Sequence, residues 1–197
     1  MLKKEVPIRS YTGEAWKTNR TNKKYLAEDF QGRCAYCDDL DKIYGGYRTY
    51  HVEHFAPKEK FPELEFTYDN LLYACPYCNG SKNDDWPSDS PTTNVVGDCG
   101  YIDPCTSDYQ KHLDRKETGE IYYKTPLGHY MYNHLKLYLR RHTIIFMMDK
   151  LQNKITELEN SISNDKTYGI DTRKKEAILA TIKSDFFDYY CQIQKEN

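Results

Sequence analysis

The sequence predicts an α+β protein with three parts: an N-terminal helix, a small core closed by a four-cysteine knuckle, and a mainly helical C-terminal extension. Two C-x-x-C pairs, CAYC and CPYC, enclose two runs of aromatic, apolar and β-branched residues that are typical of strands. Before the first pair and after about residue 130, apolar residues recur at helical spacing. These patterns place short strands in the core and helices on both sides of it.

The composition excludes a membrane protein. Of the 197 residues, 39% are apolar and 29% are charged, which suits one compact unit. No apolar run approaches the roughly 18 residues that a membrane-spanning helix needs. The first lysines are not followed by an apolar stretch, so we expect no secretory signal and a cytoplasmic location.

The first expected element is a helix over residues 13–30, ended by Gly32. We treat residues 1–33 as an N-terminal helical arm. Its expected buried contacts are aromatic or apolar: Trp16, Tyr25, Leu26 and Phe30.

The core, residues 34–87, should contain two strands and a helix. Residues 47–55 are rich in aromatic and β-branched types and predict a strand that Pro57 stops. Residues 71–74 predict a second strand that leads into the second cysteine pair. A short helix is expected to begin near Asn79.

Residues 88–197 form the expected C-terminal extension, a candidate partner-binding surface. It starts with loop composition over residues 88–100, followed by a short hairpin around Gly119 and by helix from about Tyr130. One helix face should pack on a last helix over residues 172–193 or on a protein partner. That face is an apolar seam: Met148, Leu151, Ile155, Leu158 and Ile162.

The cysteine pairs predict a metal site. Cysteines in a chain without an export signal should be reduced, and paired C-x-x-C motifs point to metal. Four thiolates favour structural zinc, because they leave no position open for water. An iron centre or redox dithiols are the alternatives. The expected zinc ligands are Cys34, Cys37, Cys75 and Cys78, and Cys99, Cys105 and Cys191 remain as buried or spare thiols.

Charge is distributed unevenly along the chain. Residues 1–33 carry eight basic and four acidic side chains, net +4, whereas residues 34–100 carry five basic and twelve acidic ones, net −7. An acidic surface repels a polyanion unless cations or a basic partner compensate. We therefore infer a metal site in the core and a companion protein.

The knuckle encloses HVEHFAPK (residues 51–58) and ends in YDNLLYACPYCNGSKND (residues 68–84). This order resembles the HNH endonuclease family, whose core is a ββα fold around one divalent metal. The resemblance covers about residues 30 to 85. It implies the following catalytic residues: Glu53 as metal ligand, His54 as general base, Asn70 orienting the loop or the base, and Asn79 as second metal ligand.

Phosphodiester hydrolysis independently requires a deprotonated water and a cation near the phosphate. A neutral imidazole can take the proton, and oxygen ligands suit Mg²⁺ or Mn²⁺. Because neighbours in a strand point to opposite faces, Glu53 and His54 can share a site only if the strand ends or bulges there. Lys82 is expected to contact a phosphate, and His51 has either a structural or a substrate-binding role.

Two positions depart from the commonest HNH pattern: Glu53 replaces Asp, and Asn79 replaces the last His. The segments 101–121 and 135–142 are similar to small HNH proteins of bacterial defence loci, the Septu-type PtuB nucleases and retron-associated relatives. That resemblance implies an ATPase partner of the PtuA type and a nucleic-acid substrate, with DNA expected. The alternatives are a non-catalytic zinc module and a stand-alone restriction-like nuclease.

Overall fold

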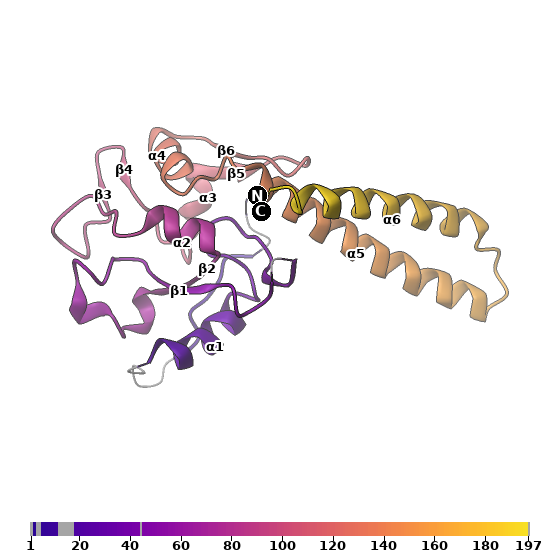
Figure 1. Ribbon diagram of the computed structural model, residues 1–197, viewed down its shortest axis with the longest axis horizontal. Helices are drawn as coiled ribbons and strands as arrows, with labels where there is room; N and C mark the ends of the chain where they lie inside the picture. The colour runs from indigo at the N-terminus through magenta and orange to yellow at the C-terminus, as the bar shows by residue number, and fades with distance from the viewer. Residues whose placement is uncertain (1, 3–4, 12–17, 44, 197) are drawn as a thin grey trace.

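A computed structural model describes residues 2, 5–11, 18–43 and 45–196. The chain folds into a body of short helices and two-stranded sheets, from which a long helical hairpin projects (Figure 1). This architecture confirms the predicted α+β class.

The centre of the body is a ββα unit. Strand β1 (His51–His54) pairs with β2 (Leu71–Ala74) in antiparallel fashion, with His54 opposite Leu71. All four β2 residues are buried, as expected for a continuous apolar run. Helix α2 (Pro76–Lys82) follows directly. The 3₁₀ turn Asp41–Ile43 precedes β1, and two further 3₁₀ turns, Pro62–Leu64 and Tyr68–Asn70, lie between β1 and β2.

Two predicted boundaries in this unit were wrong. The first strand is shorter than residues 47–55, because Thr49 closes a turn by donating its backbone N–H to the Gly46 carbonyl. Helix α2 begins at Pro76 rather than near Asn79. The Cys75 sulfur caps it by accepting the backbone N–H of Cys78, and a proline at the first helical position is favourable.

Helix α1 (Asn19–Asp29) confirms part of the predicted N-terminal helix. Leu26 and Phe30 are buried, whereas the predicted contact Trp16 and the predicted start at Gly13 lie outside the described residues. At Gly32, φ is +67°, and an added Cβ would lie 3.1 Å from the Asp41 carboxylate. Glycine therefore suits both the backbone turn and the close approach there.

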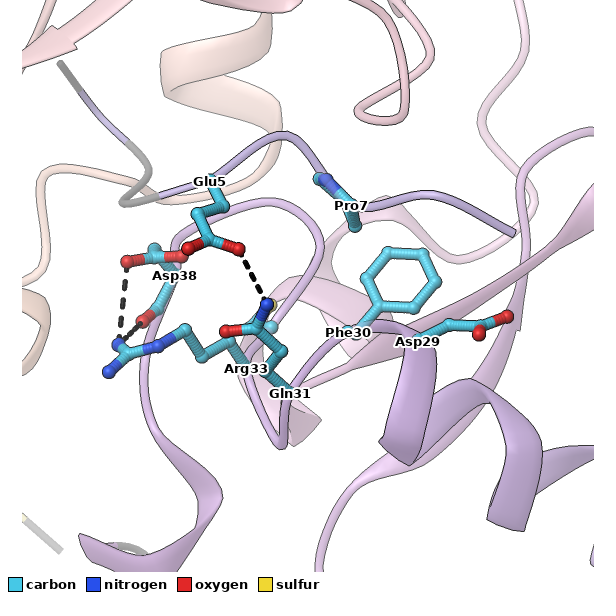
Figure 2. Close-up of a pocket in the computed structure, with 8 residues that line it drawn as sticks. Glu5, Pro7, Asp29, Phe30, Gln31, Arg33 and Asp38 are labelled. Atoms are coloured by element: carbon cyan, nitrogen blue, oxygen red, sulfur yellow. Dashed lines mark hydrogen bonds and ion pairs between the residues drawn. The ribbon is translucent and has the colours of Figure 1, made fainter. Parts of the chain in front are cut away.

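The N-terminal segment lies across the end of α1. Gln31 donates a hydrogen bond of 2.7 Å to Glu5, and Arg33 reaches the Asp38 carboxylate at 3.4 Å (Figure 2). The hollow between these residues has a volume of only about 20 Å³. It is too small for a substrate, so the functional site must lie elsewhere.

The second half of the body adds two small hairpins and two helices. Within residues 88–100, predicted as loop, β3 (Val95–Val96) pairs with β4 (Cys99–Gly100). The predicted hairpin around Gly119 is confirmed. Its strands and the neighbouring helices are α3 (Tyr109–His112), β5 (Leu113–Arg115), β6 (Ile121–Tyr123) and α4 (Pro126–His134).

The projecting hairpin consists of α5 (Arg140–Thr167) and α6 (Arg173–Ile193), which lie side by side (Figure 1). The seam predicted on α5 packs within the chain, and its members Met148, Ile155 and Ile162 are buried. One continuous core extends from Leu2 to Leu137, so the two halves of the body share their apolar interior. None of the described helices combines the length and apolar composition needed to cross a bilayer.

Candidate active site and metal knuckle

The four predicted ligand cysteines converge in the body. Cys34 and Cys37 lie in the turn before β1, Cys75 and Cys78 at the start of α2, and all four are buried. One sulfur from each lies within 4.8 Å of the others, and the Cys37 and Cys75 sulfurs are 3.8 Å apart. Corners of a tetrahedron with Zn–S bonds of about 2.3 Å are about 3.8 Å apart. The arrangement therefore fits a structural zinc ion. Of the leftover cysteines, Cys99 is exposed, and Cys105 and Cys191 are partly buried.

Residues from the second half of the chain hold the knuckle. Tyr109 donates a hydrogen bond of 2.9 Å to the Tyr36 carbonyl, and the Arg115 guanidinium donates to the Cys37 carbonyl. His142, at the start of α5, donates from Nδ1 to Asp39 at 2.7 Å. These contacts are buried and tie the knuckle to the C-terminal half.

Beside the knuckle, β1 and α2 border a cleft of about 200 Å³. Glu53, His54 and Asn79 all line it, and the loop after β1 contributes its other wall. Glu53 and His54 face one cleft although they are neighbours, because β1 ends at His54 and the chain turns away before Pro57.

Glu53 is only 5% exposed and has two close partners. Its Oε1 lies 3.0 Å from Lys82 Nζ and accepts a hydrogen bond of 3.2 Å from the Tyr36 hydroxyl. Burial raises the pKa of Glu53, and the Lys82 ammonium opposes that rise. Burial near Glu53 raises the pKa of Tyr36 well above its ordinary value, so this hydroxyl remains a donor.

Lys82, for which the sequence predicts a phosphate contact, points into the protein interior. Its side chain is 0% exposed, and its ammonium donates to the His54 carbonyl at 3.2 Å in addition to pairing with Glu53. A buried carboxylate needs a counter-ion, which explains why this lysine points inward. In this arrangement the Lys82 ammonium is held by groups of the protein itself.

The imidazole of His54 has one nitrogen engaged. Nε2 lies 3.0 Å from the Glu65 carbonyl, which can only accept a hydrogen bond. The proton of the neutral ring therefore belongs on Nε2, and the lone pair on Nδ1. Burial lowers the pKa of His54, the bond to Glu65 opposes this, and the charge of Lys58 lowers it further. Burial thus favours a neutral imidazole, and the bond to Glu65 leaves its lone pair on Nδ1.

Asn70 acts on the backbone of the loop after β1. Its amide accepts from the Ala56 N–H at 2.8 Å and donates to the Ala56 carbonyl at 2.9 Å, which fixes the chain just beyond His54. Asn79 lies inside α2 and borders the cleft. His51 lies outside the cleft and lines a neighbouring groove.

The segment that contains the knuckle and the cleft matches a known family. Residues 34–85 fit the model of the HNH endonuclease family. Residues 34–85 form an HNH domain. The ββα unit, its four cysteines and the Glu53–His54 cleft all fall within it.

Similarity extends beyond the HNH domain to Septu proteins. The Septu protein PtuB of Bacillus mycoides is 28% identical over 132 residues, which cover 56% of this chain and 43% of that protein. The PtuB of Bacillus thuringiensis is 35% identical over 74 residues, 37% of this chain and 28% of that protein. The Septu protein PtuA of Bacillus mycoides is 27% identical over 124 residues, 53% of this chain and 17% of that protein. The chain therefore spans less than half of each relative.

Sequence reasoning missed several residues of the HNH domain that shape the cleft. The Tyr36 hydroxyl contacts Glu53, and the Glu65 carbonyl contacts His54. Glu59 and Asn83 also line the cleft. No local pattern marks them. Tyr36 occupies a variable position of a C-x-x-C pair, and a backbone carbonyl leaves no trace in the sequence.

Proposed function

We propose that this chain is a metal-dependent endonuclease that hydrolyses phosphodiester bonds of nucleic acid, with DNA as its substrate. The observation that carries the proposal is the cleft that Glu53, His54 and Asn79 line together inside an HNH domain. A carboxylate, a neutral imidazole and an amide are the groups that metal-assisted hydrolysis at phosphorus requires.

In the proposed mechanism, His54 is the general base. With Nε2 bonded to the Glu65 carbonyl, Nδ1 takes a proton from the water whose oxygen attacks phosphorus, and the bond to the leaving oxygen breaks. Asn70 keeps the imidazole in place by fixing the backbone at Ala56. Such positioning matters, because a small misplacement of a reacting group is costly in rate.

Glu53 and Asn79 offer oxygen ligands of the kind that Mg²⁺ and Mn²⁺ prefer. A divalent cation bound there would neutralise developing charge on the phosphate and on the leaving oxygen. Lys82 and Tyr36 hold Glu53 through one oxygen, Oε1. We assign Lys82 the role of a buried counter-ion that keeps Glu53 ionised, in place of the phosphate contact expected from the sequence.

Replacing His54 by alanine tests the base assignment. Cleavage of plasmid and single-stranded DNA with Mg²⁺ or Mn²⁺ should fall by about 100-fold or more, because general-base catalysis typically contributes that much. The variant should keep its zinc. The matched control is His129→Ala, an exposed histidine on α4, which should cleave normally. Equal cleavage by the His54 and His129 variants would remove His54 from the mechanism.

The pH dependence of cleavage provides a second test. The proposal needs neutral His54, and burial lowers the pKa of this group below its ordinary value of 6.5. Cleavage efficiency, kcat/KM, should therefore be constant at neutral pH and fall only when the pH drops through a pKa below 6.5. A divalent cation bound nearby would lower the pKa of His54 further, so cleavage efficiency would then fall only at a still lower pH. An acidic limb centred above 6.5 would contradict this assignment.

We further propose a role in antiviral defence, together with an ATPase of the PtuA type. This part is supported by the similarity to Septu proteins and by the net charge of −7 over residues 34–100, which weakens unaided binding to nucleic acid. We assign nuclease function to residues 34–87 and partner contact to residues 88–197, where α6 exposes Ile178, Phe187 and Tyr190. Cleavage assays with and without any ATPase encoded beside the gene test this.

One observation favours a non-catalytic zinc module. Glu53 is already paired with Lys82, so a second cation is not needed to neutralise it. Titration with Mn²⁺ distinguishes the two functions. The nuclease should bind Mn²⁺ beyond its zinc, and Glu53→Gln should weaken that binding, whereas the zinc module should show no such binding.

A further inference from the structure

A second concave surface lies next to the cleft, and the proposed mechanism does not use it. It is an open groove of about 1000 Å³ between α1 and β1. Its walls come from the α1 residues Lys23 and Lys24, from Tyr47 and Arg48 in the turn before β1, and from His51 in β1 itself. We call this surface the basic groove.

The basic groove is positively charged, although the HNH domain that it borders is acidic overall. It carries three permanent cations, and the described residues that line it include no carboxylate. By contrast, residues 34–100 as a whole carry a net charge of −7. Lys24, Tyr47 and Arg48 are exposed, so the groove presents its positive charge to solvent. Such local concentration of cations attracts a polyanion more strongly than the net charge of the chain indicates.

One of these cations is fixed in position. The Lys23 ammonium lies 4.6 Å above the centre of the Tyr47 ring and 3.4 Å from the Arg48 carbonyl. The Tyr47 ring is in turn stacked on Tyr73 of β2, with centroids 6.5 Å apart. A cation held in this way loses little conformational entropy when it binds a phosphate.

The basic groove adjoins the cleft. Val52 lines both, and β1 runs from His51 in the groove to Glu53 and His54 in the cleft. At about 3.3 Å per residue, that distance along the strand is roughly 10 Å. A nucleic-acid strand seated in the groove would therefore reach the proposed catalytic residues.

We propose that the basic groove binds the phosphodiester backbone of the nucleic-acid strand on one side of the bond to be cut. The cations compensate locally for the acidic HNH domain, and Lys23, Lys24 and Arg48 make the phosphate contacts. The inference rests on the proposed function for the role of the cleft. Binding in the groove does not require cleavage, so the two can be tested apart.

The test is the affinity of the full-length chain for labelled single-stranded DNA, duplex DNA and single-stranded RNA, measured by fluorescence anisotropy over a range of salt concentrations. His54→Ala serves as the background to prevent cleavage. In this background, Lys24→Glu/Arg48→Glu should bind its preferred nucleic acid at least about tenfold more weakly. The slope of log affinity against log salt should decrease by about 1.5 to 2, because two phosphate contacts are lost.

The matched control is Lys154→Glu/Lys174→Glu, which makes the same change of charge at exposed positions of the α5–α6 hairpin. It should retain its affinity within about twofold. Zinc content and thermal melting should be the same in both double variants, which shows that both fold. A poly-glutamate peptide is included as a competitor to separate nucleic-acid binding from binding of any polyanion.

The possible outcomes separate this inference from the proposed function. If both double variants bind alike, if the parent binds none of the nucleic acids, or if poly-glutamate competes equally well, the basic groove is not a nucleic-acid surface. If the chain with His54 intact cleaves DNA but Lys24→Glu/Arg48→Glu binds normally, the nuclease proposal is supported and the proposed role of the basic groove is wrong. Binding that depends on the groove, with no cleavage by the chain either alone or together with the ATPase, supports the groove and refutes the nuclease.

Discussion

Replacing Cys75 by serine should release the zinc and unfold the body of the protein. The four sulfurs are buried. Strand β2, which pairs with β1, ends at the knuckle, and helix α2, which borders the cleft, starts there. Structural zinc typically contributes about 10 to 16 kcal/mol of apparent binding free energy to small domains. Loss of the zinc should also destabilise the second half of the chain, because Tyr109, Arg115 and His142 attach that half to the knuckle.

Metal analysis and circular-dichroism melting measure this effect. The parent should contain one zinc per chain, whereas Cys75→Ser should contain none and show no cooperative melting transition. Cys99→Ser is the matched control: this cysteine is exposed and outside the cluster, so its replacement should change stability by less than about 0.5 kcal/mol. A chelator that removes the metal without altering the melt would show that the knuckle is not structural. Iron in place of zinc would overturn the assignment of the metal.

The sequence was sufficient where a local pattern determines the structure. Strand β2 has the predicted bounds, because a short uninterrupted apolar run directly before a C-x-x-C pair favours a buried strand. The cysteines meet because each C-x-x-C spacing turns two sulfurs toward one point. The start of α2 was also readable. Pro76 directly after Cys75 is typical of the first position of a helix, so the sequence indicates a start three residues before Asn79.

The remaining features depend on contacts between residues far apart in the chain. His142 and Asp39 are 103 positions apart, and Arg115 and Cys37 are 78 apart, so no window of sequence shows that the C-terminal half holds the knuckle. Lys82 illustrates the same difficulty. Helical spacing placed it near the cleft, but whether a lysine faces solvent or a buried carboxylate depends on the strand that packs opposite it.

The position of Lys82 leads to the second large effect. Replacing Lys82 by methionine should destabilise the protein by about 3 to 5 kcal/mol at pH 8, because Glu53 would be left as a buried charge without its cation. Methionine keeps most of the side-chain volume, so packing contributes little to that loss. Denaturant melts of the zinc-loaded protein, without added Mg²⁺ or Mn²⁺, measure the change.

The double variant Glu53→Gln/Lys82→Met identifies the cause. It removes both charges, and since an ion pair replaced by neutral groups is often close to neutral in stability, it should recover most of the loss. If Lys82 instead acts through packing alone, the double variant should be no more stable than Lys82→Met.

The pH dependence of the single variant checks the same argument in a different way. Burial already raises the pKa of Glu53 in the parent, and without the opposing ammonium that pKa should rise further. A carboxyl whose pKa is higher in the folded than in the unfolded state binds its proton more tightly when folded, so folding becomes less favourable as the pH increases above the unfolded pKa. The stability deficit of Lys82→Met relative to the parent should therefore be smaller at pH 6 than at pH 8. A deficit that is equal at both values would mean that Glu53 stays ionised over this range without Lys82, which would contradict the role of Lys82 as the counter-ion that keeps it ionised.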